Sequence, residues 1–445
     1  MKTPYNVQRR AFSVRRRTLT TTLLLIVSSA LLILLAACGS QGASINTTAL
    51  NTSSVALAAT VATKAMPPTQ TSCPANGQGR PAVTAPLVHG NQQTVVYVDT
   101  TSSKSTLKSY NASTGQTAIL TSVSGNSQVA LVSAQVSTDG QYVMFITGRK
   151  LQMIRMDGQG LQTLYCYPAV TGIPGNLTDL LWSPNQRLAV FEEPPATGGP
   201  AGPVVRLLNL GNGSVQTLAH SGEHVAIQLD AWLGNTQVYY TIYSGAMIAL
   251  YNNVYALNVT GPTDKNSTEV APIEGNLWDM NLTPDGRTLI LSQCAAVLTG
   301  GNGSGPQYQM MPPSLISAQS ANGGILRFIY GSHVHMVVQT RISNQGLLFV
   351  IEDTTYMVGP QDGLWKINFD GTGLTRLLSG HTVLADAHTT WANVSRDGTF
   401  YVAINKPVQG ANTSTKVYVG PFKGGTPKNF ITTNDAIAIA GWAIR

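Results

Sequence analysis

The sequence predicts an all-β protein built from repeated antiparallel units, and three observations lead to this fold class. One short pattern recurs along the chain: an apolar segment, a tight polar turn and a second apolar segment. The turns follow one another at intervals of 46 to 59 residues. Gly and Pro are abundant, with 43 and 23 residues, as is typical of a chain rich in turns. Self-similarity at such a period indicates a repeat architecture.

Each repeated turn is centred on Asp or Asn. These residues are Asp139, Asn185, Asn235, Asp285, Asn344 and Asp397. Asp, Asn and Gly tolerate the positive φ angles that tight hairpins require. We therefore expect a first strand before each turn and a second strand after it. A period of about 50 residues suits a propeller blade of four strands with its loops.

Third and fourth strands are predicted after these hairpins. Polar and apolar residues alternate in segments that begin at Leu151, Val205, Val254 and Leu364, and a Gly turn then leads to a short fourth strand. The combination of a Ser-Pro-Asp-Gly-type hairpin with such a strand resembles the TolB-like and WD-repeat-like β-propeller families. The resemblance covers residues 86–445 and implies a propeller that serves as an interaction platform.

The two ends of this region complete each other. Residues 95–99 and 107–115 look like second and third strands without a first strand, whereas residues 436–444 look like a first strand with nothing after it. Trp442 matches a Trp in the other first-strand segments. Those residues are Trp182, Trp232, Trp278 and Trp391. The pattern predicts seven blades closed by the C-terminal strand, and a count of six or eight stays open.

The N-terminal region predicts export. Residues 1–17 are basic and residues 18–37 are apolar, as in a signal peptide. The run ends in Leu35-Ala-Ala-Cys38, which resembles the lipobox of bacterial lipoproteins and implies a lipidated Cys38. The localisation that follows is the outer face of the cell membrane or the periplasm, with a lipid anchor. An uncleaved signal anchor is the alternative, because a spanning helix needs about 20 apolar residues, and the export route stays open between the general and twin-arginine pathways.

Residues 38–85 are rich in Ser, Thr and Ala without an acidic residue, which predicts a flexible tether before the propeller of residues 86–445. Cys73, Cys166 and Cys294 remain after lipidation of Cys38. One disulfide is possible in an exported protein. Cys73 with Cys166 is one candidate pair, but the sequence leaves the pairing open. Cys294 ends an apolar segment and is expected to be buried.

The charge distribution argues against nucleic-acid binding. Six of the 27 Lys and Arg residues lie in the first 17 positions, so removal of the leader leaves 21 basic against 20 acidic residues. Phosphate-backbone binding needs clustered basic side chains, and no such cluster follows Arg17. We expect a monomer without a cofactor.

The sequence contains no recognisable catalytic or metal-binding motif, such as a nucleophile elbow, a phosphate loop or a zinc helix. His333 and His335 would share one face of a strand and could bind a metal. We prefer the interpretation that these histidines have a structural role and bond a neighbouring blade, and we predict no metal site.

Acidic residues close several second strands, next to long loops that a rigid scaffold positions for function. These loops cover residues 192–203, 297–324, 352–363 and 405–415, and the second of them could be a partner-docking flap. The candidate ligand-binding residues are Asp99, Glu192, Glu193, Glu352, Asp353 and Tyr356. The carboxylates could surround a cation, an amine or a sugar. Solvated loop charges are the alternative. We expect replacement of Glu192, Glu193, Glu352 and Asp353 by Ala to leave folding nearly intact, because exposed loop charges usually contribute within about half a kcal/mol, and to weaken binding.

These observations predict a membrane-anchored binding or scaffolding module for a protein, peptide or glycan. The alternatives are an exported lyase or hydrolase with its site in the propeller funnel, and an accessory module of an envelope complex. The first is favoured because no reactive constellation is visible. The fold resemblance adds only an analogy.

Overall fold

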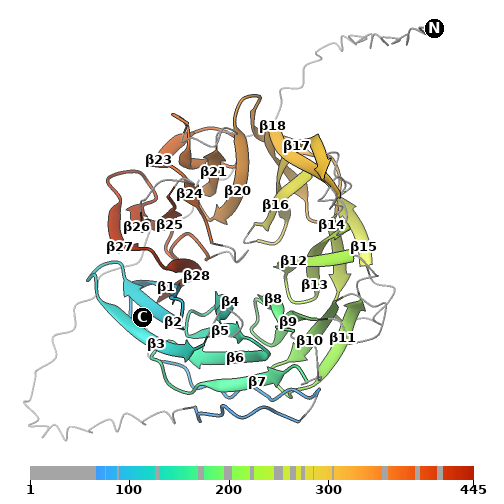
Figure 1. Ribbon diagram of the computed structural model, residues 1–445, viewed down its shortest axis with the longest axis vertical. Helices are drawn as coiled ribbons and strands as arrows, with labels where there is room; N and C mark the ends of the chain where they lie inside the picture. The colour runs from blue at the N-terminus through green and yellow to red at the C-terminus, as the bar shows by residue number, and fades with distance from the viewer. Residues whose placement is uncertain are drawn as a thin grey trace, which may run out of the picture. The chain divides into compact units, whose positions relative to one another are not determined.

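The protein is a seven-bladed β-propeller, as the sequence predicted. The computed structural model describes residues 67–75, 77–87, 90–125, 130–168, 175–194, 203–220, 225–244, 254–260, 267–271, 276–283, 285–302, 305–352, 359–385, 391–407 and 414–444. All of them belong to one unit, Ala62–Arg445. Within these ranges, 28 strands form seven four-stranded antiparallel sheets that follow one another around a ring (Figure 1).

Each blade has an innermost strand followed outward by three further strands, and blades 1 to 4 have the following strands in this order. Blade 1 contains β28 (Ala436–Ile444), β1 (Gln93–Thr100), β2 (Lys104–Asn111) and β3 (Thr117–Ser124). Blade 2 contains β4 (Leu131–Val136), β5 (Tyr142–Thr147), β6 (Lys150–Arg155) and β7 (Gln162–Cys166). Blade 3 contains β8 (Thr178–Trp182), β9 (Leu188–Glu193), β10 (Val204–Asn209) and β11 (Val215–His220). Blade 4 contains β12 (Val225–Leu233), β13 (Gln237–Ser244), β14 (Val254–Asn258) and β15 (Ser267–Ala271).

Blades 5 to 7 complete the ring with the same order of strands. Blade 5 contains β16 (Asn276–Leu282), β17 (Thr288–Asn302), β18 (Gly305–Ser320) and β19 (Arg327–Ser332). Blade 6 contains β20 (Met336–Ser343), β21 (Gly346–Glu352), β22 (Gly363–Ile367) and β23 (Thr375–Ser379). Blade 7 contains β24 (Thr382–Val383), β25 (Phe400–Asn405), β26 (Thr415–Pro421) and β27 (Lys428–Thr433).

The recurring turn motif has a common hydrogen-bond pattern that explains its sequence. In blade 2, the Ser137 hydroxyl donates to the carboxylate of Asp139 (2.6 Å) and accepts the amide hydrogen of Tyr142 (3.0 Å). The Asp139 carboxylate also accepts the amide hydrogen of Gln141 (3.0 Å). The same bonds recur from Ser183, Thr283 and Ser395. A hydroxyl followed two positions later by Asp or Asn therefore fixes the turn between first and second strands.

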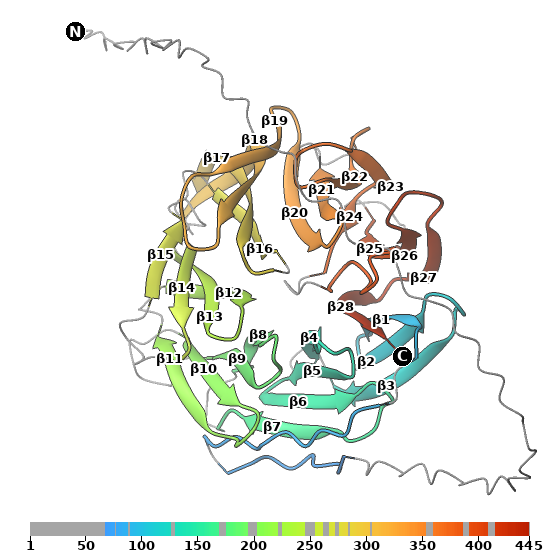
Figure 2. The ribbon, with the colours of Figure 1, turned by 180° about the vertical axis from the view of Figure 1, so that it is seen from behind.

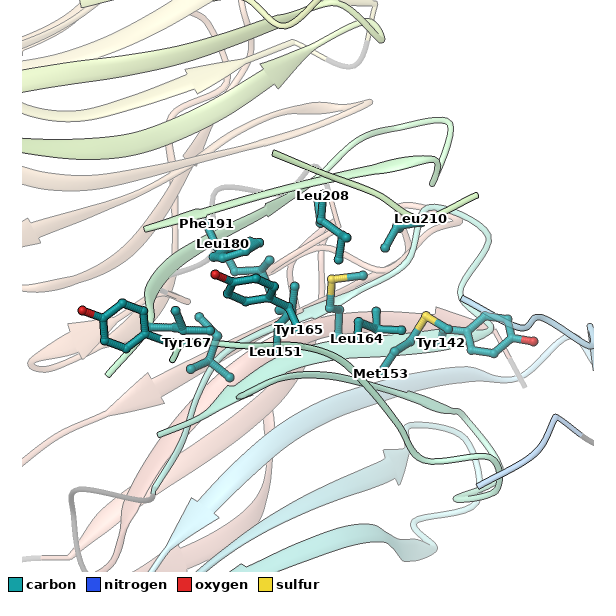
Figure 3. Close-up of a cluster of buried hydrophobic side chains, with 14 residues drawn as sticks. Tyr142, Leu151, Met153, Leu164, Tyr165, Tyr167, Leu180, Phe191, Leu208 and Leu210 are labelled. Carbon is teal, nitrogen blue, oxygen red and sulfur yellow. The ribbon is translucent and has the colours of Figure 1, made fainter. Parts of the chain in front are cut away.

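Apolar side chains fill the space between neighbouring blades. Figure 3 shows the cluster between blades 2 and 3, where Leu151, Met153 and Leu164 pack against Phe191 and Leu208. All five side chains are fully buried. Similar clusters lie between the other described blades. The wide apolar faces of adjacent sheets thus hold the ring together, because burial removes them from water.

The C-terminal strand closes the ring as predicted. β28 pairs with β1 from Gln93↔Ile444 to Thr100↔Ala436, and both views place it innermost in blade 1 (Figures 1 and 2). Trp442 is fully buried on β28, and its amide hydrogen bonds the Trp391 carbonyl in blade 7 (2.8 Å). The pairing covers the edge of β1 that would otherwise be exposed.

A segment before the first blade lies against the outside of blades 2 and 3. Cys73 forms a disulfide with Cys166 on β7, so the candidate pairing is confirmed. The amide hydrogen of Arg80 bonds the Leu164 carbonyl (2.7 Å), and that of Ala82 bonds the Leu210 carbonyl (2.8 Å). We call the described residues 67–87 the strap. Backbone hydrogen bonds and a disulfide thus hold the last described residues of the expected tether against the propeller.

The insertion predicted at residues 297–324 is mostly strand. β17 and β18 pair from Thr288↔Ser320 to Asn302↔Gly305 and form a long hairpin. Glycines in this stretch suggested a loop, and two prolines argued against a strand. The register passes from Cys294↔Ser314 to Ala295↔Met311, so that Pro312 and Pro313 have no partner on β17. A bulge is where a strand tolerates residues that lack an amide hydrogen.

Residues 1–66, with the expected signal peptide and Cys38, lie outside the described residues. No helix in the described part of the chain has the length and the apolarity needed to span a membrane. Cys294 is buried and forms no disulfide, as expected for a small apolar side chain on β17.

Candidate functional site

The innermost strands of blades 1 to 6 enclose a cavity of about 360 Å³ at the centre of the ring. This volume lies within the range of roughly 300–1,000 Å³ that is usual for ligand pockets. Its polar lining residues are Ser133, Gln135, Asp179, Gln228, Asp279, Gln339 and Arg341. Leucine, alanine, valine and isoleucine side chains from the same strands and from β1 form the rest of the wall. We treat this central cavity as the candidate site.

A β-bulge interrupts the innermost strand of each of these six blades. The register shifts on β4, β8, β12, β16, β20 and β28. In two blades the bulge carries a non-glycine residue with positive φ: 50° at Ser133 and 40° at Asp179. Both residues line the cavity. Bulges re-aim side chains and are frequent beside functional sites, and strained residues of this kind tend to cluster there.

Three of the cavity's polar side chains also join consecutive blades. Gln135 accepts the amide hydrogen of Trp182 (3.2 Å) and donates to the Leu180 carbonyl on β8. Asp279 accepts the amide hydrogen of Thr340 on β20 (2.8 Å). The Gln339 carbonyl oxygen accepts the amide hydrogen of Leu384, after β24 (2.7 Å). Each side chain thus reaches the innermost strand of the next blade, or the residue just beyond it, and fixes the geometry of the ring.

Arg341 adds a buried ion pair to the cavity wall. Its Nη1 donates to Asp279 Oδ2 (2.7 Å), its Nη2 donates to the Ala385 carbonyl, and the side chain is only 3% exposed. The Arg341 Nε–H is buried and has no hydrogen-bond partner in the described part of the protein. A buried donor without a partner carries a free-energy penalty, and a bound acceptor would remove it.

Gln228 and Ser133 line the cavity, but their side chains, unlike those of Gln135, Asp279 and Gln339, form no hydrogen bond to a neighbouring blade in the described ranges. Gln228 precedes the bulge of β12, whereas Gln135, Asp279 and Gln339 follow the bulges of their strands. Among the described residues, no side-chain hydrogen bond occupies the Gln228 amide or the Ser133 hydroxyl. These groups can therefore bond a ligand without disturbing the contacts between blades.

Among the predicted acidic residues, Glu192 lies beside the cavity wall. It pairs with Thr178 in the ladder of β8 and β9, and the Thr178 hydroxyl donates to its Oε2 (2.9 Å). Its Oε1 has no hydrogen-bond partner among the described residues, and the residue is 7% exposed. Burial, and then the negative charge of Asp179, raise the pKa of Glu192 to about 7. The reading of Glu192 as a solvated loop charge is therefore wrong.

Glu193 and Asp99 have partners within the scaffold. Glu193 is 3% exposed, accepts a hydrogen bond from the Tyr165 hydroxyl on β7, and accepts another from Arg206 Nε (2.7 Å). It therefore joins blades 2 and 3, and its replacement would not be neutral for folding. Asp99 forms an ion pair with Lys108 on β2.

Glu352 ends β21, and its Oε1 lies 3.3 Å from Nδ1 of His381, a residue that directly precedes the first strand of blade 7. Burial raises the pKa of Glu352, and the nearby His381 opposes this rise. A histidine that contacts the adjoining blade is thus present, as preferred from the sequence. His333 and His335 lie in the bend between β19 and β20. The expectation that they share one face of a strand is therefore wrong. Asp353 and Tyr356 lie outside the described residues.

The structure does not gather the predicted acidic residues into one cluster. Asp99, Glu193 and Glu352 belong to blades 1, 3 and 6 and have separate partners. No group of three or more metal-ligating side chains occurs in the described ranges. The sequence reading missed the inner-strand residues Asp279 and Arg341. Their signal was a charged residue within an otherwise uncharged first strand.

Neither a protein-family model nor a curated protein sequence matches the chain. Among solved structures, the chain is similar to a prolyl endopeptidase (14% identity, TM-score 0.52, 80% of this chain and 50% of the other). It is also similar to the acylaminoacyl peptidase of Pyrococcus horikoshii (10% identity, TM-score 0.50, 78% of this chain and 51% of the other). A structure described as TolB from Agrobacterium tumefaciens is 14% identical, with a TM-score of 0.43, over 75% of this chain and 99% of the other. The chain spans about half the length of the two peptidases, and the likeness to them concerns the fold alone.

Proposed function

We propose that the chain is a membrane-anchored, extracytoplasmic binding module whose propeller receives a protein, peptide or glycan at the mouth of its central cavity. The observation that carries this proposal is the cavity itself. The bulged inner strands of blades 2 to 6 supply polar groups to it, and the side chains of Gln228 and Ser133 make no hydrogen bond within the described scaffold. A concave site with a few convergent polar groups is the usual form of a binding site.

The loop face of the propeller is the proposed entrance. The first residues of the innermost strands pair with the last residues of the second strands, as in Thr178↔Glu192, Met336↔Glu352 and Ala436↔Thr100. Four of the polar cavity residues, Ser133, Asp179, Gln228 and Gln339, lie in the first half of their innermost strands, on this side. Glu192, Glu352, Asp353 and Tyr356 would then border the mouth, while Asp99 and Glu193 support the strands beneath them.

The anchor is proposed from the sequence Leu35-Ala-Ala-Cys38 at the end of an apolar run. Mass spectrometry of the membrane fraction tests it. We expect an N-terminal, lipid-modified Cys38, and we expect Cys38→Ser to prevent cleavage and lipidation. A product that begins at another residue, or one that retains the leader, would contradict the anchor.

The binding role is tested with the purified full chain on peptide and glycan arrays. We expect a ligand whose binding weakens at least tenfold in Glu192→Gln. The matched control is Asp285→Asn, which changes a carboxylate to an amide on the opposite, hairpin face. Equal losses in both variants, or a loss in the control alone, would contradict a site on the loop face.

A further inference from the structure

The central cavity has two chemically different sides. Blades 2 to 4 contribute Ser133, Asp179 and Gln228, and blade 6 contributes Gln339 and Arg341. Gln135 and Asp279 also line the cavity but are held by bonds to the next blade, Asp279 by the Thr340 amide hydrogen and by Arg341 Nη1. Strands β8 and β20, which carry Asp179 and Gln339, lie across the centre of the ring from each other (Figure 1). A ligand that fills the cavity would therefore meet both sides at once.

The blade 6 side presents hydrogen-bond donors. The Gln339 carbonyl oxygen is held by the Leu384 amide hydrogen, which leaves the Gln339 NH₂ group as the available part of the side chain. The Arg341 Nη atoms are engaged by Asp279 and by backbone carbonyls, which leaves the buried Nε–H. Two neighbouring donors with fixed orientation suit a carboxylate, which accepts through two oxygens.

The side formed by blades 2 to 4 favours a cation. Asp179 lines the cavity, and Glu192 lies close enough to it that the negative charge of Asp179 raises the pKa of Glu192. Asp179 also interacts with protein groups, but a carboxylate has about four acceptor positions. The Gln228 and Ser133 oxygens add neutral acceptors. An ammonium group donates three hydrogen bonds and would relieve the repulsion between the carboxylates.

We propose that the central cavity binds a small zwitterion, with its ammonium group at Asp179, Gln228 and Ser133 and its carboxylate at Gln339 and Arg341. The proposal rests on the proposed binding function and adds a small ligand held inside the cavity, beneath the mouth that receives the protein, peptide or glycan. Leu180, Leu229 and Ile439 form apolar wall, which suits a hydrocarbon chain joining the two charged ends.

Probes that carry one or both charges test the two sides separately. Calorimetry with the full chain in detergent, at pH 8, would compare ω-amino acids from glycine to 8-aminooctanoate with hexylamine and hexanoate. We expect one ω-amino acid to bind at least tenfold more tightly than hexylamine and hexanoate, because only a zwitterion satisfies both sides.

Two variants remove one side each with little risk to folding. Asp179→Asn removes the charge while keeping a residue type that tolerates positive φ. Gln339→Glu keeps the oxygen that accepts the Leu384 amide hydrogen but replaces the donor with a negative charge. Their matched controls are Asp370→Asn in an exposed turn of blade 6 and Gln216→Glu at an exposed position of β11.

We expect Asp179→Asn to weaken zwitterion and hexylamine binding at least tenfold, and Gln339→Glu to weaken zwitterion and hexanoate binding similarly. The two controls should bind as the wild type does. Absence of zwitterion binding, equal binding of a single-charge probe, or loss at only one side would overturn the proposal. Lipidation of Cys38 and binding on the arrays are separate measurements, so failure here is distinguishable from failure of the binding role.

Discussion

At the scale of single residues, the charged groups around the cavity are unusual because so little water reaches them. Glu192 is held by one hydroxyl group, and its neighbour Asp179 has the same charge. Arg341 and Asp279 form their ion pair with 3% and 4% of their side chains exposed. Both arrangements are sensitive to the loss or gain of one charge.

Glu192 should make stability depend on pH. Its pKa is raised from 4.5 to about 7 in the folded protein, so unfolding releases a proton between these values. The free energy of unfolding should therefore fall as the pH rises from about 4.5 to about 7, by up to roughly 3 kcal/mol, and change little outside this window on account of this group. Urea unfolding across this range should show a weaker dependence for Glu192→Gln. Glu269→Gln, at an exposed position of β15, is the control and should follow the wild type; matching curves for both variants would contradict the assignment.

The ion pair should respond differently to single and double replacement. Arg341→Met leaves Asp279 buried without its guanidinium partner, and we expect a loss of about 3–5 kcal/mol. The double variant Arg341→Met with Asp279→Leu should recover much of this loss, because no buried charge remains. Urea unfolding of both single variants and the double variant gives the coupling energy. Additive losses would mean that the two side chains do not depend on each other.

At the scale of elements, the sequence predicted strands and turns well but predicted bulges and long pairings poorly. The turns at Asp139 and Asp285 were recognisable because local side-chain bonds specify them. The bulge at Asp179 was not, since it depends on the neighbouring strand. The hairpin of β17 and β18 was missed because its glycines and prolines suggest a loop. The strap was missed because its polar residues form backbone bonds that composition does not reveal.

The strap should stabilise the protein through its disulfide. Cys73 and Cys166 are 93 positions apart, and a bridge across such a loop typically contributes about 2–4 kcal/mol. We expect reduction to lower the melting temperature and to expose the strap to proteolysis. The variant with both cysteines replaced by Ala should already show this lower temperature, and reductant should change it no further. An unchanged melting temperature after reduction would show that the backbone bonds suffice.

At the scale of the whole molecule, the seven-bladed ring was predictable but the cavity was not. The period of the turns and the matching ends specify the blade count and its closure. The cavity combines residues of six blades, from Val98 to Ala440, and only their positions in space relate them. The predicted acidic residues lie at the ends of second strands in separate blades. Their burial and their separate partners were not visible in the sequence.

Loss of the closing strand should affect the entire ring. Deletion of residues 434–445 removes the innermost strand of blade 1, exposes the edge of β1 and leaves the contacts of the buried Trp442 unfilled. We expect insoluble protein, or a cooperative destabilisation of several kcal/mol. Thermal unfolding of the soluble fraction measures this. A truncated protein that melts like the full chain would contradict a role of β28 in closure.

The pairing of β28 with β1 also sets an order of events during synthesis. Paired residues of the two strands are between 336 and 351 positions apart in the sequence. Therefore β1 leaves the ribosome long before β28 has been synthesised. Blades 2 to 7 draw their strands from continuous stretches of chain and can form while the rest is still being made. The nascent chain must keep β1 from pairing elsewhere throughout that interval, which makes its first blade the last to fold and the step most exposed to misassembly.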